Sequence, residues 1–150
     1  MYFGEYERTV DYKGRLTVPS HLLLSSEDSD WSRVMVLKGE HTCLYLYDLQ
    51  TWKAVLDEAY RGMDDDESRV FMHRVLSDAY LAEVDNLKRI TLPAALLAHA
   101  QVDRRAVIVG MFNRLELWNP AAWQSYLETL EEVQIPTIAD LSRARIRQVS

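Results

Sequence analysis

Residues 11–19 read DYKGRLTVP, and residues 85–93 read DNLKRITLP. The two stretches share Asp, Arg, Thr and Pro at matching places, and both positions that flank the Thr are apolar in each copy. A second pair of matching blocks follows, LYLYD at 44–48 and LELWN at 115–119, and each is followed four residues later by a Trp. Because two blocks recur in the same order, the sequence indicates a duplicated unit of about half the chain.

Short β-strands are predicted around each copy of the repeated stretch. Residues 6–10 and 16–18 have strand character and flank a turn in which Gly14 can adopt the positive φ of a tight hairpin. Pro19 cannot donate to a strand ladder, so we expect pairing to stop there and a short helix to begin near Ser20. Further strands are expected at 34–37, 44–47, 81–84, 90–92, 107–109 and 115–118, with an Ala-rich helix at 93–100. The expected fold class is α+β.

Longer helices are predicted after each β-rich unit. Their apolar stripes at helical spacing comprise Trp52, Val55, Leu56, Ala59 and Tyr60 in the first half, and Trp123, Tyr126, Leu127 and Leu130 in the second. A tryptophan stripe could be a ligand platform, but packing of the helix against the strands is the simpler interpretation. Another helix is expected at 66–78. The acidic run at 64–67 suits its N-terminal end better than a calcium loop, whose Gly and later Glu are missing.

Composition sets the class of protein. The chain has 150 residues, of which 48% are hydrophobic and 27% charged, as in compact globular domains. No apolar run has the length of a membrane span, and the start of the chain does not resemble a signal peptide. The single cysteine, Cys43, excludes an internal disulfide and favours a cytoplasmic location. The net charge of −6 argues against indiscriminate nucleic-acid binding, so any such contact must be local.

No reacting constellation is present in the sequence. The four histidines lie 20, 32 and 26 residues apart, and neither they nor the one cysteine have the spacing of a metal site. The motifs of serine hydrolases, P-loops and dinucleotide-binding folds are missing. Asp11 and Asp85 could be paired catalytic carboxylates, but an Arg follows each by four residues, so Asp–Arg ion pairs are the simpler account. We therefore expect no enzyme activity, no metal, no cofactor and no small-molecule substrate.

Basic residues gather at the two repeated turns. The first turn carries Lys13 and Arg15, with Arg8 upstream, and the second carries Lys88 and Arg89. An arginine presents a planar fork of donors that matches phosphate oxygens or the O6/N7 edge of guanine. The alternative is a surface Asp–Arg bridge, which contributes only about 0–1 kcal/mol to stability. The residues alone leave both interpretations open. If the turns bind DNA, two equivalent turns could reach two sites in neighbouring grooves of a duplex.

Three of these blocks resemble the MraZ family: the first turn at 11–19, the stretch CLYLY at 43–47 with its Trp52, and GMFNRLELW at 110–118. The resemblance extends over residues 1–142. It implies two fused AbrB-like units that form a swapped-hairpin β-barrel, an intrachain pseudo-dimer, with flanking helices. The implied units are 5–51 and 79–122, with a helical connection at 52–78 and a C-terminal helix and tail at 123–150.

The same resemblance implies a function. It predicts a ring-shaped homo-oligomer that acts at the nucleoid as a sequence-specific transcriptional regulator, usually a repressor. Its target is the bacterial division and cell-wall gene cluster, where it binds G-rich direct repeats in promoter DNA. Its Asp-x-x-x-Arg turns contact the DNA, which here implies the residues Asp11, Lys13, Gly14, Arg15, Asp85, Lys88 and Arg89. The alternative is a ring-forming structural or protein-interaction module that does not bind DNA directly.

One position departs from the family pattern. The family usually keeps Gly before the second Arg, whereas this chain has Lys88. If a positive φ is needed there, a lysine costs about 1–2 kcal/mol. Either the second turn takes another shape, or Lys88 adds a phosphate contact, so we expect Arg15 and Lys13 to dominate binding. The C-terminal arginines, Arg143, Arg145 and Arg147, are a solvated helix end or a further phosphate contact.

Overall fold

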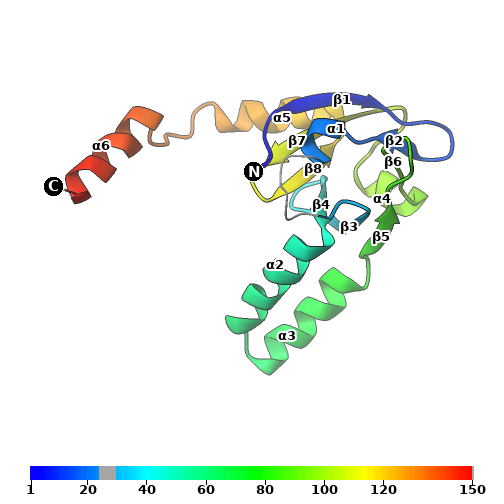
Figure 1. The fold of residues 1–150 in the computed structure, drawn as a ribbon, viewed down its shortest axis with the longest axis horizontal. Coiled ribbons are helices and arrows are strands. Elements are labelled where there is room, and N and C mark those ends of the chain that lie inside the picture. Colours follow the sequence, from blue (N-terminus) through cyan, green and yellow to red (C-terminus); the bar gives the residue numbers. More distant parts are fainter. Residues whose placement is uncertain (24–29, 150) are drawn as a thin grey trace.

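The computed structural model describes residues 1–23 and 30–149 and shows a mixed α+β fold with antiparallel sheets (Figure 1). The strands are β1 (Glu5–Thr9), β2 (Arg15–Thr17), β3 (Arg33–Lys38), β4 (Leu44–Asp48), β5 (Tyr80–Glu83), β6 (Arg89–Thr91), β7 (Arg105–Met111) and β8 (Arg114–Trp118). The helices are α1 (Ser20–Leu23), α2 (Leu49–Arg61), α3 (Asp65–Phe71) with a π-helical extension η1 (Met72–Leu76), α4 (Ala94–His99), α5 (Pro120–Leu130) and α6 (Ile138–Val149). Each predicted strand and helix is confirmed within a few residues.

The strand order contains the duplication. Six strands form one sheet in the order β1-β7-β8-β4-β3-β5, and β2 and β6 form a separate two-stranded ribbon. Exchange of each strand with its equivalent in the other half (β1 with β5, β2 with β6, β3 with β7, β4 with β8) returns the same order, reversed. Four of the pairings, β1–β7, β2–β6, β3–β5 and β4–β8, join one half to the other. The two halves are therefore interleaved.

The predicted hairpin between residues 6–10 and 16–18 is wrong in its strand pairing. The turn itself forms, because the Asp11 N–H donates to the Arg15 carbonyl at 3.0 Å. Beyond the turn, however, β1 pairs with β7 and β2 pairs with β6. This exchange places Leu16 directly opposite its equivalent Ile90, and both side chains are buried in the core. The burial of two apolar side chains favours the exchanged pairing over a local hairpin.

The core lies on both faces of the six-stranded sheet. On one face, the ribbon and the short helices α1 and α4 enclose the main apolar cluster, which includes Leu16, Ile90 and Leu96. On the other face, Trp52 of α2 and Trp123 of α5 pack in two smaller clusters, as the apolar stripes predict. Three stripe residues lie outside these clusters: Leu130, which is exposed at the end of α5, and Ala59 and Tyr60 of α2. The Tyr60 ring contacts Phe71 of α3 instead.

The second repeated block is explained by helix capping. Asp48 and Asn119 occupy the last position of their blocks, and each precedes a helix. The Asp48 Oδ1 atom accepts a hydrogen bond from the Thr51 N–H at 2.9 Å, and the Asn119 Oδ1 atom accepts one from the Ala122 N–H at 3.0 Å. Such N-caps are worth about 1 kcal/mol each. The acidic run also begins a helix as predicted, with Asp64 as its cap.

Two helical segments extend away from the sheets. Figure 1 shows α2 and α3 as a helical pair that projects from the body, and α6 beyond α5 at the opposite end from the ribbon. Among the described residues, no helix combines the length and the apolar character needed to cross a membrane. No cluster of metal-ligating side chains occurs in that same part of the chain.

Candidate nucleic-acid interface

The ribbon has one buried face and one outward face. Side chains alternate along a strand, so the burial of Leu16 and Ile90 turns their neighbours away from the core. In the register, Arg15 lies opposite Thr91, and Thr17 lies opposite Arg89. We call these four outward side chains, Arg15, Thr17, Arg89 and Thr91, the ribbon face. The two threonines were not predicted as site residues.

An aspartate fixes each turn and its arginine at the same time. The Asp11 Oδ1 atom accepts the N–H groups of Lys13 and Arg15, both at 2.9 Å, and its Oδ2 atom accepts the Arg15 Nε–H at 2.7 Å. Asp85 does the same for Leu87 and Arg89, at 2.9, 2.9 and 2.8 Å. The predicted Asp–Arg pairs are therefore confirmed.

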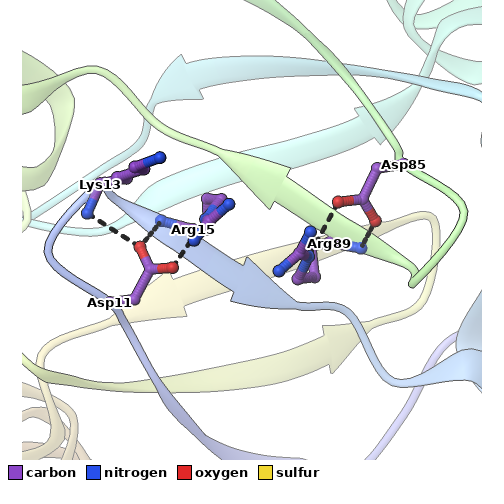
Figure 2. A network of polar contacts seen from close by, with 5 residues as sticks. All are labelled: Asp11, Lys13, Arg15, Asp85 and Arg89. Carbon is purple, nitrogen blue, oxygen red and sulfur yellow. Dashed lines mark hydrogen bonds and ion pairs between the residues drawn. The ribbon is translucent and has the colours of Figure 1, made fainter.

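The ion pairs leave the ends of both guanidinium groups available. Each arginine uses Nε for its aspartate, and no hydrogen bond joins its terminal nitrogens to another described residue. The side chains of Arg15 and Arg89 are 29% and 32% exposed, so neither is sealed beneath other elements. Figure 2 shows both arginines over the middle of the ribbon, between Asp11 and Asp85. Each can therefore donate a fork of N–H groups to a ligand.

Both carboxylates are charged at neutral pH. Hydrogen bonding from the Arg15 backbone N–H is the main cause that holds the pKa of Asp11 below its ordinary value, with the Arg15 side chain adding to it. The Arg89 backbone N–H lowers the pKa of Asp85 in the same way. The negative charges keep the two arginines in one orientation, which reduces the entropy lost when they bind.

The two arginines lie closer together than the expectation of two sites in neighbouring grooves requires. Arg15 and Arg89 are diagonal neighbours across one antiparallel pair of strands, and such residues lie about 7–8 Å apart. Successive turns of a DNA groove are about 34 Å apart. The two arginines therefore form one continuous surface and lie too close together to reach successive turns of one groove.

Lys88 does not change the shape of the second turn. Its φ is 63°, close to the 80° of Gly14, and the Lys88 N–H donates to the Asp85 carbonyl at the same 3.0 Å as the Gly14 N–H to Asp11. The alternative of a different turn shape is therefore wrong, and the lysine side chain is exposed. At Gly14 an added Cβ would lie 2.6 Å from the Leu92 carbonyl oxygen.

Arg8 and Arg143 lie outside the ribbon face. Arg8 donates to the carbonyl of Thr17 at 3.1 Å and to that of Glu7 at 2.8 Å, so it braces the edge of β2. Arg143 pairs with Asp140 at 2.8 Å on α6, at the opposite end of the molecule (Figure 1). The side chains of Arg145 and Arg147 lie outside the described part of the chain.

The one cysteine is unsuited to nucleophilic chemistry. Cys43 is 1% exposed, and its Sγ atom lies 3.1 Å from the Glu40 carbonyl oxygen. Burial, with a smaller contribution from the nearby Glu116, raises the pKa of the thiol to about 12. The thiolate, which is the nucleophile, is therefore scarce at neutral pH.

Comparison with known proteins gives a family. A family model described as "MraZ protein, putative antitoxin-like" matches residues 1–73 and 75–144. A relative from Desulfitobacterium hafniense (strain DSM 10664 / DCB-2) is 39% identical over 134 residues, which cover 88% of this chain and 90% of that protein. Relatives from Pediococcus pentosaceus and Deinococcus radiodurans are 34% and 35% identical over 133 residues, 88% and 87% of this chain and 90% of each relative.

All three relatives carry the name Transcriptional regulator MraZ. That name describes a regulator and not an enzyme, in agreement with the lack of a catalytic constellation in the sequence. The family model covers nearly the whole chain in two consecutive matches. The chain belongs to the MraZ family.

Proposed function

We propose that the chain is a DNA-binding transcriptional regulator whose ribbon enters the major groove of a duplex. The observation that carries this proposal is the outward pair of arginines, Arg15 and Arg89, each fixed by an aspartate with its terminal nitrogens left unbonded within the described residues. The major groove of B-DNA admits a two-stranded β-ribbon, and arginine pairs bidentately with guanine there. The names of the relatives are consistent with this role.

The other turn residues support the two arginines in this proposal. Lys13 and Lys88 are exposed beside the ribbon face, so they are placed to meet the phosphates on either side of the groove. Asp11 and Asp85 orient the arginines and, through their backbone hydrogen bonds, hold the turns. Gly14 allows the first turn to pack closely against the Leu92 carbonyl. The matching hydrogen bonds of the two turns support a role for Arg89 equal to that of Arg15.

We further propose the finer properties that the family resemblance implies. These are a fused pair of AbrB-like units with swapped hairpins, and a ring-shaped homo-oligomer in the cytoplasm at the nucleoid. The regulator would repress a division and cell-wall gene cluster through G-rich direct repeats in its promoter. The reversible strand order supports the fused-pair interpretation. The net charge of −6 supports the ring. A single ribbon on an acidic body binds DNA weakly, whereas several ribbons that bind together reach a higher overall affinity.

A protein-interaction role is the second candidate. It is favoured by the Nε atoms of both arginines, which are already paired with carboxylates as in an ordinary surface bridge. Salt titration separates the two roles. DNA binding releases counterions, so its affinity falls steeply with salt, by a slope of about −0.9 for each phosphate neutralised. The affinity of a protein interface without charged contacts does not fall with salt concentration in this way.

The first test is the substitution of each arginine, Arg15→Ala and Arg89→Ala, in an electrophoretic shift with the DNA upstream of the gene. Loss of a bidentate contact to guanine costs about 1–3 kcal/mol, so we expect specific affinity to fall about 5- to 150-fold. Arg61→Ala is the matched control, since it removes the same charge from an exposed position on α2. Circular dichroism should be unchanged in all three. Unchanged binding of the Arg15 variant would remove the central residue from the proposal.

A further inference from the structure

We infer that Thr17 and Thr91 complete the base-contacting surface, and that their methyl groups contact the C5-methyl of thymines beside the guanines that the arginines bind. This inference rests on the proposed DNA-binding function and adds a second base to it. Neither threonine belongs to the Asp-x-x-x-Arg turns, and both lie on the strands of the ribbon instead.

Both threonines are available for such a contact. Their side chains are exposed on the same face as the arginines. Neither hydroxyl forms a side-chain hydrogen bond with any residue that the structure describes, whereas Asp11, Arg15, Asp85 and Arg89 are all engaged in the turns. The β-branched side chain of threonine is stiff at χ1, so each methyl group is held in a defined direction. The threonine side chains therefore point outward, have restricted rotation about χ1 and can contact a ligand.

The register places each threonine beside an arginine. Thr91 lies directly opposite Arg15, and Thr17 lies directly opposite Arg89. Residues in opposite positions have Cβ atoms about 4.5–5.5 Å apart, while successive bases are separated by about 3.4 Å along a strand. A threonine is therefore within one or two base pairs of the base that its neighbouring arginine contacts.

The chemistry of threonine selects thymine through the methyl group. A hydroxyl is both a donor and an acceptor, so it can bond to the edge of any base and discriminates little. A methyl group, in contrast, gains from apolar contact with the C5-methyl of thymine, which cytosine lacks. In this inference the arginines recognise guanine, and the threonines distinguish thymine from cytosine at a neighbouring base pair.

The test compares two probes of the upstream DNA, one made with thymidine and one with deoxyuridine at every thymine position. The second probe keeps the hydrogen-bonding edges and lacks only the C5-methyl groups. Loss of one buried methyl contact corresponds to a change of about fourfold in affinity, so two contacts predict a loss of about 15-fold for the unchanged chain. Equal binding of the two probes by the unchanged chain would overturn the inference.

Two double variants separate the methyl group from the hydroxyl. Thr17→Ser with Thr91→Ser keeps both hydroxyls and removes both methyls, and we expect it to bind the two probes equally. Thr17→Val with Thr91→Val keeps the methyls, and we expect it to retain the preference for thymidine. If the serine pair keeps the preference, the probe difference reflects DNA shape and the inference fails. If the valine pair alone loses affinity, the hydroxyls make the contact and the inference also fails.

Two controls complete the experiment. Thr129→Ser lies on α5, where the Thr129 hydroxyl donates to the Tyr126 carbonyl, and it should leave the preference for thymidine unchanged. An unrelated duplex of equal length tests the proposed function itself. If the unchanged chain does not prefer its upstream DNA to that duplex, DNA recognition fails as a whole. If it does prefer it and still ignores the thymine methyls, only the inference about threonine fails.

Discussion

Lys88 adopts a left-handed backbone conformation, and at the equivalent position of the first turn the residue is Gly14. Its φ of 63° lies in the left-handed region, where a residue with a Cβ is disfavoured by about 1–2 kcal/mol. Glycine avoids this cost but loses more entropy on folding, so we expect Lys88→Gly to stabilise the fold by about 0.5–1 kcal/mol. For a chain of this size the melting temperature should rise by about 1–4 °C. The same variant should reduce the salt slope of DNA binding by about 0.9 if Lys88 contacts a phosphate.

The reciprocal variant, Gly14→Lys, is the control for this prediction. A Cβ at Gly14 would lie 2.6 Å from the Leu92 carbonyl oxygen and 3.3 Å from a methyl of Leu97 on α4. We expect this variant to melt at a lower temperature than the unchanged chain. A Lys88→Gly chain that melts below the unchanged chain would show that the lysine side chain stabilises the turn through contacts of its own.

Asp11 and Asp85 determine how the interface responds to acid. Hydrogen bonds from their arginines lower both pKa values in the folded state, compared with about 3.9 in an unfolded chain. A group with a lowered folded pKa adds stability that is fully present above the unfolded pKa and is lost as the pH falls through the folded value. We therefore expect the contribution of these carboxylates to be constant from pH 5 to 8, to begin to fall below about pH 4, and to vanish only as the pH falls through the folded pKa values.

The measurement is the free energy of unfolding from pH 2.5 to 8, compared with an Asp11→Asn, Asp85→Asn double variant. Asparagine keeps an oxygen for the backbone N–H groups of each turn and removes the charge that faces the arginine. The difference between the two chains should shrink as the pH falls through the folded pKa values. A difference that stays the same across the whole range would contradict the assigned role of the carboxylates.

At the scale of the elements, the pairing of β1 with β7, β2 with β6, β3 with β5 and β4 with β8 joins the two halves. A fragment that ends at Gly62 retains β1 to β4, and within it only β3 and β4 pair with each other. We expect fragments 1–62 and 63–150 each to fail to fold as a monomer, because their strands and the apolar face of the ribbon lose their partners. Co-expression should restore a folded one-to-one complex, measured by circular dichroism and light scattering. A monomeric fragment with the native spectrum would contradict the interleaved fold.

The elements also show how far the sequence could predict this structure. The turn at Asp11 and the caps at Asp48 and Asn119 follow from local chemistry, and the positions of the strands follow from local apolar patterns. The strand that pairs with β2 cannot be predicted from such patterns. The alternation of apolar and polar residues shows which face of a strand is buried, but it does not show which strand lies beside it. The prediction of a local hairpin failed for this reason.

The candidate site was predicted only in part, for two further reasons. The arginines were found through the repeat of Asp and Arg at a fixed spacing, but their place on one face required the β2–β6 register. Thr17 was missed although its signal was present: a residue next to the apolar Leu16 on a short strand must point outward. The sequence does not determine the shape of the Lys88 turn, because the strain of about 1–2 kcal/mol is comparable with the gain from the hydrogen bonds that the turn makes.

At the scale of the whole molecule, the charge of the body opposes the DNA binding that we propose for the ribbon. The chain carries a net charge of −6, so a single ribbon approaches DNA against repulsion from the rest of the surface. The ribbon lies at one end of the molecule, away from α6 and α5 (Figure 1), which keeps the basic side chains at an extremity. The charge of the body therefore weakens the binding of a single ribbon to DNA.

The proposed ring therefore predicts how affinity depends on the number of binding sites in the DNA. Once one ribbon is bound, the next binding event is effectively intramolecular, and matched spacing raises the overall affinity by about 10²–10⁴. We expect probes with one, two and four copies of the repeat to bind with increasing affinity and with steeper salt dependence, measured by electrophoretic shift. Insertion of about five base pairs, half a helical turn, between copies turns the next site to the opposite side of the duplex. That insertion should return the affinity towards that of a single copy. If affinity depends neither on the number of copies nor on their spacing, the ribbons bind independently and no ring connects them.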